Sequence, residues 1–182
     1  MTFLNKIHVI PDELQNHLLA ILQYKTFKKG TYLLKKGHIS RHIFFIEKGL
    51  VRCYYTEDNK DISAWFMKEG DIAISVNSFF DQIISTESIQ ALEETAVYYL
   101  TYNELEDIYQ RFVSFNINGR KLITSYYQKS ERRAMSIRSL KAKKRYEYLL
   151  KNEPDILQRV PRKFLASYIG ISEVTLSNIH SR

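Results

Sequence analysis

The stretch that decides the fold is PRKFLASYIGISEVTLSNIHSR, residues 161–182. Pro161 precedes a first short helix, and Gly170 follows that helix, where a tight junction requires a left-handed backbone conformation. Ala166 is small at the point where a second helix would cross the first, and Ile171 fills the gap between them. Apolar residues are expected on both inner faces: Leu165, Ile169, Leu176 and Ile179. This spacing predicts a helix-turn-helix, for which an ordinary helical hairpin in a core is the alternative.

The second helix of this pair is expected to present a polar outer face. Ser172 can cap its first turn, and Glu173 suits the positive end of its dipole. Short polar side chains on such a face are typical of a helix that enters the major groove of DNA. The predicted base contacts are Glu173, Val174, Thr175, Ser177 and Asn178. The rest of the predicted DNA interface is Ser172 together with the candidate phosphate contacts Arg162, Lys163 and Arg182.

The charge of the chain is concentrated in its last third. The whole sequence carries a net charge of +7, but residues 1–119 hold 12 basic and 15 acidic side chains. Residues 120–182 hold 15 basic and 5 acidic side chains, a net charge of +10. Such asymmetry favours a polyanionic partner, although a solubilising surface gives the same composition. The run Lys141–Arg145 adds candidate phosphate contacts, which position a protein on DNA without reading its sequence.

Length and composition exclude several classes of protein. A chain of 182 residues with 45% hydrophobic and 13% aromatic residues fits one folded domain plus a small accessory domain. No apolar run is long enough to cross a bilayer, and the N-terminal residues lack the apolar core of a signal peptide. The single cysteine, Cys53, excludes a disulfide framework and any multi-cysteine zinc or iron–sulfur site. We therefore expect a cytoplasmic protein without a cofactor.

Residues 25–100 change to the period-two pattern and the residue types of β-strands. The strand-length segments are broken at glycines, namely Gly30, Gly37, Gly49 and Gly70. This predicts an antiparallel sandwich or roll. The polar run Glu57–Asp61 is expected at a hairpin tip, because Asp58 and Asn59 are both good turn residues. Before the roll, residues 11–24 predict a short amphipathic helix with its apolar face formed by Leu14, Leu18, Leu19 and Leu22.

Residues 102–152 are expected to be helical, with one long helix over about 114–140. An apolar stripe recurs along it at steps of three and four: Leu122, Ile123, Tyr126, Tyr127, Ala134 and Ile137. Such a stripe either packs on its own domain or forms the seam of a dimer. The length of the helix and the charges that flank the stripe favour the seam.

The order of these parts resembles the cyclic-AMP receptor protein and fumarate–nitrate regulator (Crp/Fnr) family of bacterial transcription factors. Lys28–Tyr55 is similar to the first half of the family's β-roll, and Ile89–Leu105 to its last strands. Arg145–Ile179 is similar to the DNA-binding end of members from Bacteroidetes-type bacteria.

The resemblance implies an α+β fold in three parts. These are an antiparallel β-roll like a cyclic-nucleotide-binding domain over residues 1–112, a dimerisation helix over 113–140, and a helix-turn-helix over 141–182. The implied function is sequence-specific transcriptional regulation. The implied partners are duplex DNA, a second copy of the chain, an unidentified small-molecule effector and RNA polymerase, with no membrane.

The sequence departs from the family where members bind cyclic AMP. Those members carry Gly-Glu, whose Glu holds the ribose hydroxyl, and Arg-Ser, whose Arg neutralises the cyclic phosphate. Here Ile74 and Ser75 stand in place of Gly-Glu, and Ile84–Thr86 covers the place of Arg-Ser. A buried phosphate without a paired cation is costly, so we expect no response to cyclic AMP. A ligand would instead be neutral or apolar, with candidate pocket residues Trp65, Ser75, Phe79, Phe80, Ser85, Thr86, Tyr126 and Tyr127.

Two other classes of function compete with a regulator. His38, His42 and Glu47 faintly resemble a cupin metal motif. However, histidines four residues apart on a strand do not converge as that motif requires, and the later His180 lies in the predicted second helix of the helix-turn-helix. We therefore expect neither a metal nor an enzyme. The stronger alternative is a ligand-binding or protein-interaction module of the same fold that has lost specific DNA binding.

Overall fold

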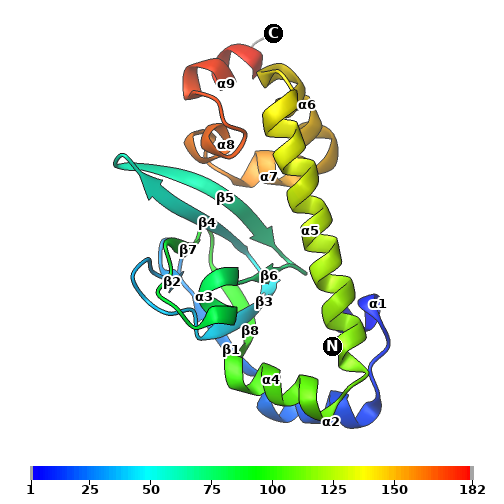
Figure 1. Ribbon diagram of the computed structural model, residues 1–182. Coiled ribbons are helices and arrows are strands. Elements are labelled where there is room, and N and C mark those ends of the chain that lie inside the picture. Colours follow the sequence, from blue (N-terminus) through cyan, green and yellow to red (C-terminus); the bar gives the residue numbers. More distant parts are fainter. Residues whose placement is uncertain (1, 181–182) are drawn as a thin grey trace.

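The computed structural model describes residues 2–180, and within them two four-stranded antiparallel sheets form a roll. The strand orders are β1-β8-β3-β6 and β2-β7-β4-β5 (Figure 1). The strands are β1 Gln23–Phe27, β2 Tyr32–Leu34, β3 His42–Lys48, β4 Leu50–Glu57, β5 Lys60–Lys68, β6 Ile72–Ala73, β7 Glu87–Ala91 and β8 Thr95–Thr101. The predicted α+β fold with an antiparallel roll is confirmed.

Helices surround the roll at both of its ends. Helix α5 runs along one side of the molecule, from the N-terminal helices at one end to the C-terminal helices at the other (Figure 1). The helices are α1 Thr2–Ile7, α2 Asp12–Ile21, α3 Val76–Asp81, α4 Tyr102–Arg111, α5 Phe115–Ser139, α6 Ala142–Asn152, α7 Pro154–Arg159, α8 Arg162–Tyr168 and α9 Glu173–His180. The helical region expected over 102–152 is therefore interrupted before and after α5.

Two tight turns of the roll depend on left-handed backbone. Asp58 (φ 47°) and Asn59 (φ 60°) connect β4 to β5, as expected for a two-residue hairpin turn. Gly49 (φ 105°) connects β3 to β4, and a Cβ atom there would lie 2.6 Å from the carbonyl oxygen of Glu94. Only glycine fits that position without moving the backbone.

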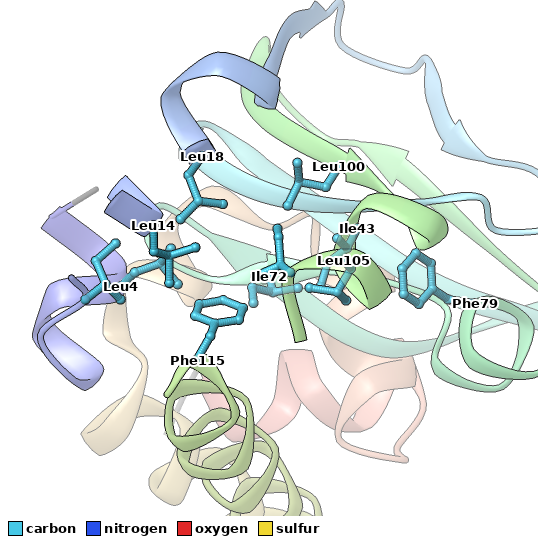
Figure 2. Packing of buried hydrophobic residues seen from close by; sticks show 11 residues of the cluster. Leu4, Leu14, Leu18, Ile43, Ile72, Phe79, Leu100, Leu105 and Phe115 are labelled. Carbon is cyan, nitrogen blue, oxygen red and sulfur yellow. The ribbon is translucent and has the colours of Figure 1, made fainter. Parts of the chain in front are cut away.

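The N-terminal helices pack on one end of the roll. Their core combines Leu14 and Leu18 of α2 with Ile43 and Leu100 of the sheet and with Phe115 of α5 (Figure 2). The expected helix over 11–24 is present as α2, but the prediction for one residue of its apolar face is wrong. Leu19 is 62% exposed, because it lies about 100° around the helix from the buried Leu18.

Asn118 fastens helix α1 to the start of α5. Its side chain is buried, and its amide donates hydrogen bonds to the carbonyl oxygens of Leu4 (3.1 Å) and His8 (2.9 Å). The ammonium group of Lys121, one turn further on, donates to the carbonyl oxygen of Ile7. The carbonyl groups of Ile7 and His8 at the end of α1 thus receive side-chain donors, and that of Leu4 accepts a hydrogen bond in addition to the one from the amide of His8.

Candidate nucleic-acid interface and ligand pocket

Helices α8 and α9 form a helix-turn-helix. Gly170 (φ 66°) lies between them in the left-handed conformation, and the amide of Ile171 donates to the carbonyl oxygen of Ala166 at 3.0 Å. The hydroxyl oxygen of Ser172 accepts a hydrogen bond from the amide of Thr175 (3.0 Å), which caps α9. The inner faces are apolar as expected: Leu165, Ala166, Ile169 and Leu176 are buried, and Ile179 is half-buried.

Most of the predicted DNA contacts lie on the outer surface of this unit. Val174 is 70% exposed and Thr175 is half-buried. The other predicted contacts that the structure describes are all exposed, namely Arg162, Lys163, Ser172, Glu173, Ser177 and Asn178. Arg182 lies outside the described residues. Of the six candidates from Ser172 to Asn178, five are therefore exposed and only Thr175 is half-buried. Exposed side chains at these positions can enter a major groove.

The basic run before this unit divides into exposed and packed side chains. Lys141, Lys143 and Lys144 are exposed, and Lys144 pairs with Glu147 at 3.0 Å. Arg145 is half-buried, and a Cβ atom on Gly170 would lie 3.0 Å from its guanidinium. Arg145 thus lies against the turn between α8 and α9, and its contact with phosphate stays a prediction.

Helices α7 and α8 are joined to the roll by polar contacts. The guanidinium of Arg159 donates to Glu69 (2.8 and 2.9 Å) and to Glu93 (2.7 and 3.0 Å). These bonds lower the pKa of Glu69 to about 2, despite the opposing effect of burial. Lys68 of β5 pairs with Asp155 of α7. These ion pairs thus attach α7, the helix that precedes the helix-turn-helix, to the surface of the roll.

Arg52 occupies the centre of this contact. Its side chain is 1% exposed, and its guanidinium lies 4.2 Å from the ring centroid of Tyr54 and 3.8 Å from that of Phe164. Its Nε donates to the hydroxyl of Ser63 (2.9 Å), which also contacts the hydroxyl of Ser167 (2.9 Å). Sequence reasoning missed this residue. The available signal was an arginine within the apolar strand segment Leu50–Tyr55.

The apolar stripe on α5 serves two different surfaces. Leu122 and Tyr126 pack on the core of their own chain. The hydroxyl of Tyr126 accepts from the amide of Ile72 (2.8 Å) and donates to Asp71 (3.3 Å), and burial together with Asp71 raises its pKa. The expectation that Tyr126 lies in a dimer seam is wrong for this reason. Ile123 and Tyr127, in contrast, are 58% and 65% exposed.

A cavity of about 1100 Å³ lies between the roll, α5 and the C-terminal helices. Four of the predicted pocket residues line it: Trp65, Phe80, Tyr126 and Tyr127. Phe79 does not line the cavity, because its ring is buried against Tyr102 in the N-terminal core. Thr86 is exposed away from the lining, and Ser75 and Ser85 are buried behind it. Four of the eight predicted pocket residues therefore line this cavity, and the binding of a ligand there stays a prediction.

Glu87 of β7 is the lining residue that Ser75 and Ser85 support. Its carboxylate accepts hydrogen bonds from the Ser75 hydroxyl (2.6 Å) and from the Cys53 thiol (2.9 Å). The hydroxyl groups of Ser75 and Ser85 lie 3.0 Å apart. Burial, reinforced by the charge of Glu87, raises the pKa of Cys53, so this cysteine remains a thiol and a hydrogen-bond donor. Sequence reasoning named both serines but not the acid between them.

The residues of the suggested cupin motif do not converge. His38 is exposed in a turn, and the ring of His42 packs on Tyr99 at 5.2 Å. Glu47 accepts a hydrogen bond from the hydroxyl of Tyr98. Among the described residues, no group of three or more metal-ligating side chains is arranged to hold an ion. No helix in residues 2–180 is long and apolar enough to span a membrane.

Comparison with known proteins supports the same architecture. Residues 24–112 match the family model of the cyclic nucleotide-binding domain. No curated protein sequence matches the chain. A Crp/Fnr-family transcriptional regulator from Eubacterium rectale has a similar structure, with a TM-score of 0.74 and 15% identity over 93% of this chain and 82% of that one. The chain has the fold of the Crp/Fnr regulators.

Two further solved structures have a similar fold. FixK2 from Bradyrhizobium japonicum has a TM-score of 0.72 and 16% identity, over 88% of this chain and 83% of its own. The c-di-GMP-responsive global regulator CLP from Xanthomonas campestris has a TM-score of 0.71 and 15% identity, over 94% and 90%. The Crp/Fnr architecture therefore covers the roll, α5 and the helix-turn-helix together.

Proposed function

We propose that this protein is a transcriptional regulator of the Crp/Fnr type that binds specific sequences in duplex DNA. The observation that carries the proposal is the exposed polar face of α9 on a well-formed helix-turn-helix. The basic charge of residues 120–182 supports it, because phosphate contacts supply most of the affinity for DNA. The cytoplasm is the compartment in which this regulator meets DNA, and RNA polymerase is a further partner under this proposal. Catalysis has no part in it.

The active form is a homodimer that pairs along α5. Ile123, Tyr127 and Ile137, which also line the cavity, are exposed apolar residues of this helix, and burying them in a second copy is favourable. A two-fold dimer also presents two copies of α9 to successive major grooves, about 34 Å apart, as a pseudo-palindromic site requires.

Cyclic AMP is not the effector in this proposal. The segment Ile84–Thr86 supplies no cation for a cyclic phosphate, and the nearby Glu87 adds a negative charge. Titration calorimetry with cyclic AMP and cyclic GMP should give no heat of binding at micromolar concentrations. Micromolar affinity for either nucleotide would contradict the electrostatic argument.

DNA binding is tested by selecting sites from genomic fragments of the source organism with the purified protein. Fluorescence anisotropy should then show at least about a thousandfold preference for selected sites over random duplexes at moderate salt. Equal affinity for both would reject the regulator. In that case the fold serves as a ligand-binding or protein-interaction module, the alternative that the intact cavity favours.

A further inference from the structure

Several residues of the roll and of α3 that line the cavity are apolar, and the acid Glu87 is in contact with one of them. Cys53 from β4, Val76 and Phe80 from α3, and Trp65 from β5 line it beside Glu87 from β7. Trp65 is the Cα partner of Cys53 across the β4–β5 ladder, and Cys53 donates to Glu87. An aromatic ring on β5 and a carboxylate on β7 therefore lie in the same sheet, on the two strands that flank β4.

The charge of this carboxylate is not matched by a cation. Glu87 accepts hydrogen bonds from a thiol and a hydroxyl, and within the described residues it forms no ion pair. Of the cations that line the cavity nearer to the C-terminal helices, two lysines are paired with acids, whereas the guanidinium of Arg133 lies 5.7 Å from the ring centroid of Trp65. Lys68 pairs with Asp155, Lys129 pairs with Asp71, and Arg133 donates to the carbonyl oxygen of Tyr168. A largely apolar cavity thus contains an acid whose charge a ligand can compensate.

We infer that this end of the cavity binds an organic cation with an aromatic or apolar body, whose ammonium or amidinium group pairs with Glu87. The cation would gain a charge-assisted hydrogen bond to the carboxylate and an attraction to the ring of Phe80, because the ring of Trp65 already faces the guanidinium of Arg133. The hydroxyl of Ser75 donates to the carboxylate, and the hydroxyl of Ser85 contacts both Ser75 and the backbone of Glu87. Binding of this ligand does not involve DNA. Only its role as an effector rests on the proposed function.

The inference is tested on the full-length protein without DNA. Phenethylamine is compared with phenethyl alcohol and phenylacetate, which keep the ring and change the charge from positive to neutral to negative. Trp65 is the only tryptophan of the chain, so its fluorescence reports occupation of the cavity. Calorimetry then gives the affinities. A second series, tryptamine with tryptophol and indoleacetate, tests a larger ring by calorimetry alone.

At least one amine should bind about tenfold or more tightly than its alcohol, and its acid should bind weakest. Glu87→Gln should abolish this preference, whereas Glu94→Gln, the same change on the exterior of the roll, should leave it intact. Absence of binding by both amines, equal binding of the alcohols, or a preference that survives Glu87→Gln would overturn the inference. The wild-type series decides the question even if Glu87→Gln does not fold. Specific DNA binding is measured separately, so either proposal can fail alone.

Discussion

A single buried cation, Arg52, connects the roll to the helix-turn-helix. Its planar guanidinium lies between the rings of Tyr54 and Phe164, and its Nε reaches Ser63. Burial lowers the pKa of Arg52, although an arginine stays charged at any physiological pH. Lysine cannot reproduce this contact, because its compact ammonium group does not stack on two rings.

Replacing Arg52 by alanine should lower the free energy of unfolding by about 2–4 kcal/mol, because stacking is lost and a cavity forms. Arg52→Lys should recover less than half of this loss. Urea unfolding measures both, with Arg41→Ala as the control at an exposed arginine. A change below about 0.5 kcal/mol, typical of surface substitutions, would mean that the stacked arrangement contributes nothing.

On α9, Asn178→Ala should cost about 1–3 kcal/mol of binding energy on the preferred site and relax the choice at one base position. Lys163→Ala should instead weaken all duplexes alike and reduce the salt slope by about one unit, because it removes a phosphate contact. Anisotropy titrations at several salt concentrations separate the two effects. Asn77→Ala, an exposed asparagine on α3, is the matched control. A uniform loss for Asn178→Ala would remove its role in base recognition.

At the scale of elements, α5 packs Tyr126 on its own roll and leaves Tyr127, which also lines the cavity, 65% exposed. Tyr127→Glu should therefore raise the dissociation constant of the dimer at least about tenfold, by placing a charge in an apolar contact. Tyr126→Phe should leave association unchanged and lower the stability of the fold, because the hydrogen bond to Ile72 is lost. Sedimentation velocity and thermal unfolding distinguish them. Dimerisation unaffected by Tyr127→Glu would exclude this seam.

The contact between α7 and the roll should respond to acid. Glu69 has a folded-state pKa of about 2, below its ordinary value of 4.5, because Arg159 stabilises the charged form. A depressed carboxylate pKa contributes stability that is complete above about pH 4.5 and declines as the pH falls toward 2. The stability difference between wild type and Arg159→Gln should accordingly be largest above pH 5 and shrink in acid. A difference that is constant with pH would contradict the ion pair.

At the scale of the whole molecule, the sequence predicts elements better than the contacts between them. Gly170 and the hairpin residues Asp58 and Asn59 carry local signals that any turn of that geometry needs. The hydrogen bond between Ser63 and Ser167 joins residues 104 positions apart. No sequence pattern around a serine indicates which distant residue it will bind. Patterns of burial along a helix also have limited angular resolution. For this reason the stripe on α5 did not distinguish the buried tyrosine from its exposed neighbour.

The fastening of α1 by Asn118 has a consequence for the order of folding. The amide of Asn118 and the carbonyl oxygen of Leu4 are separated by 114 residues, so a large loop must close before they meet. Contacts of such long range form late in most small proteins. We therefore expect α1 to dock only after the roll has assembled, and Asn118→Ala to accelerate unfolding while it leaves the rate of refolding nearly unchanged. Helix α1 is then synthesised before the roll but docks on it only after the roll has folded.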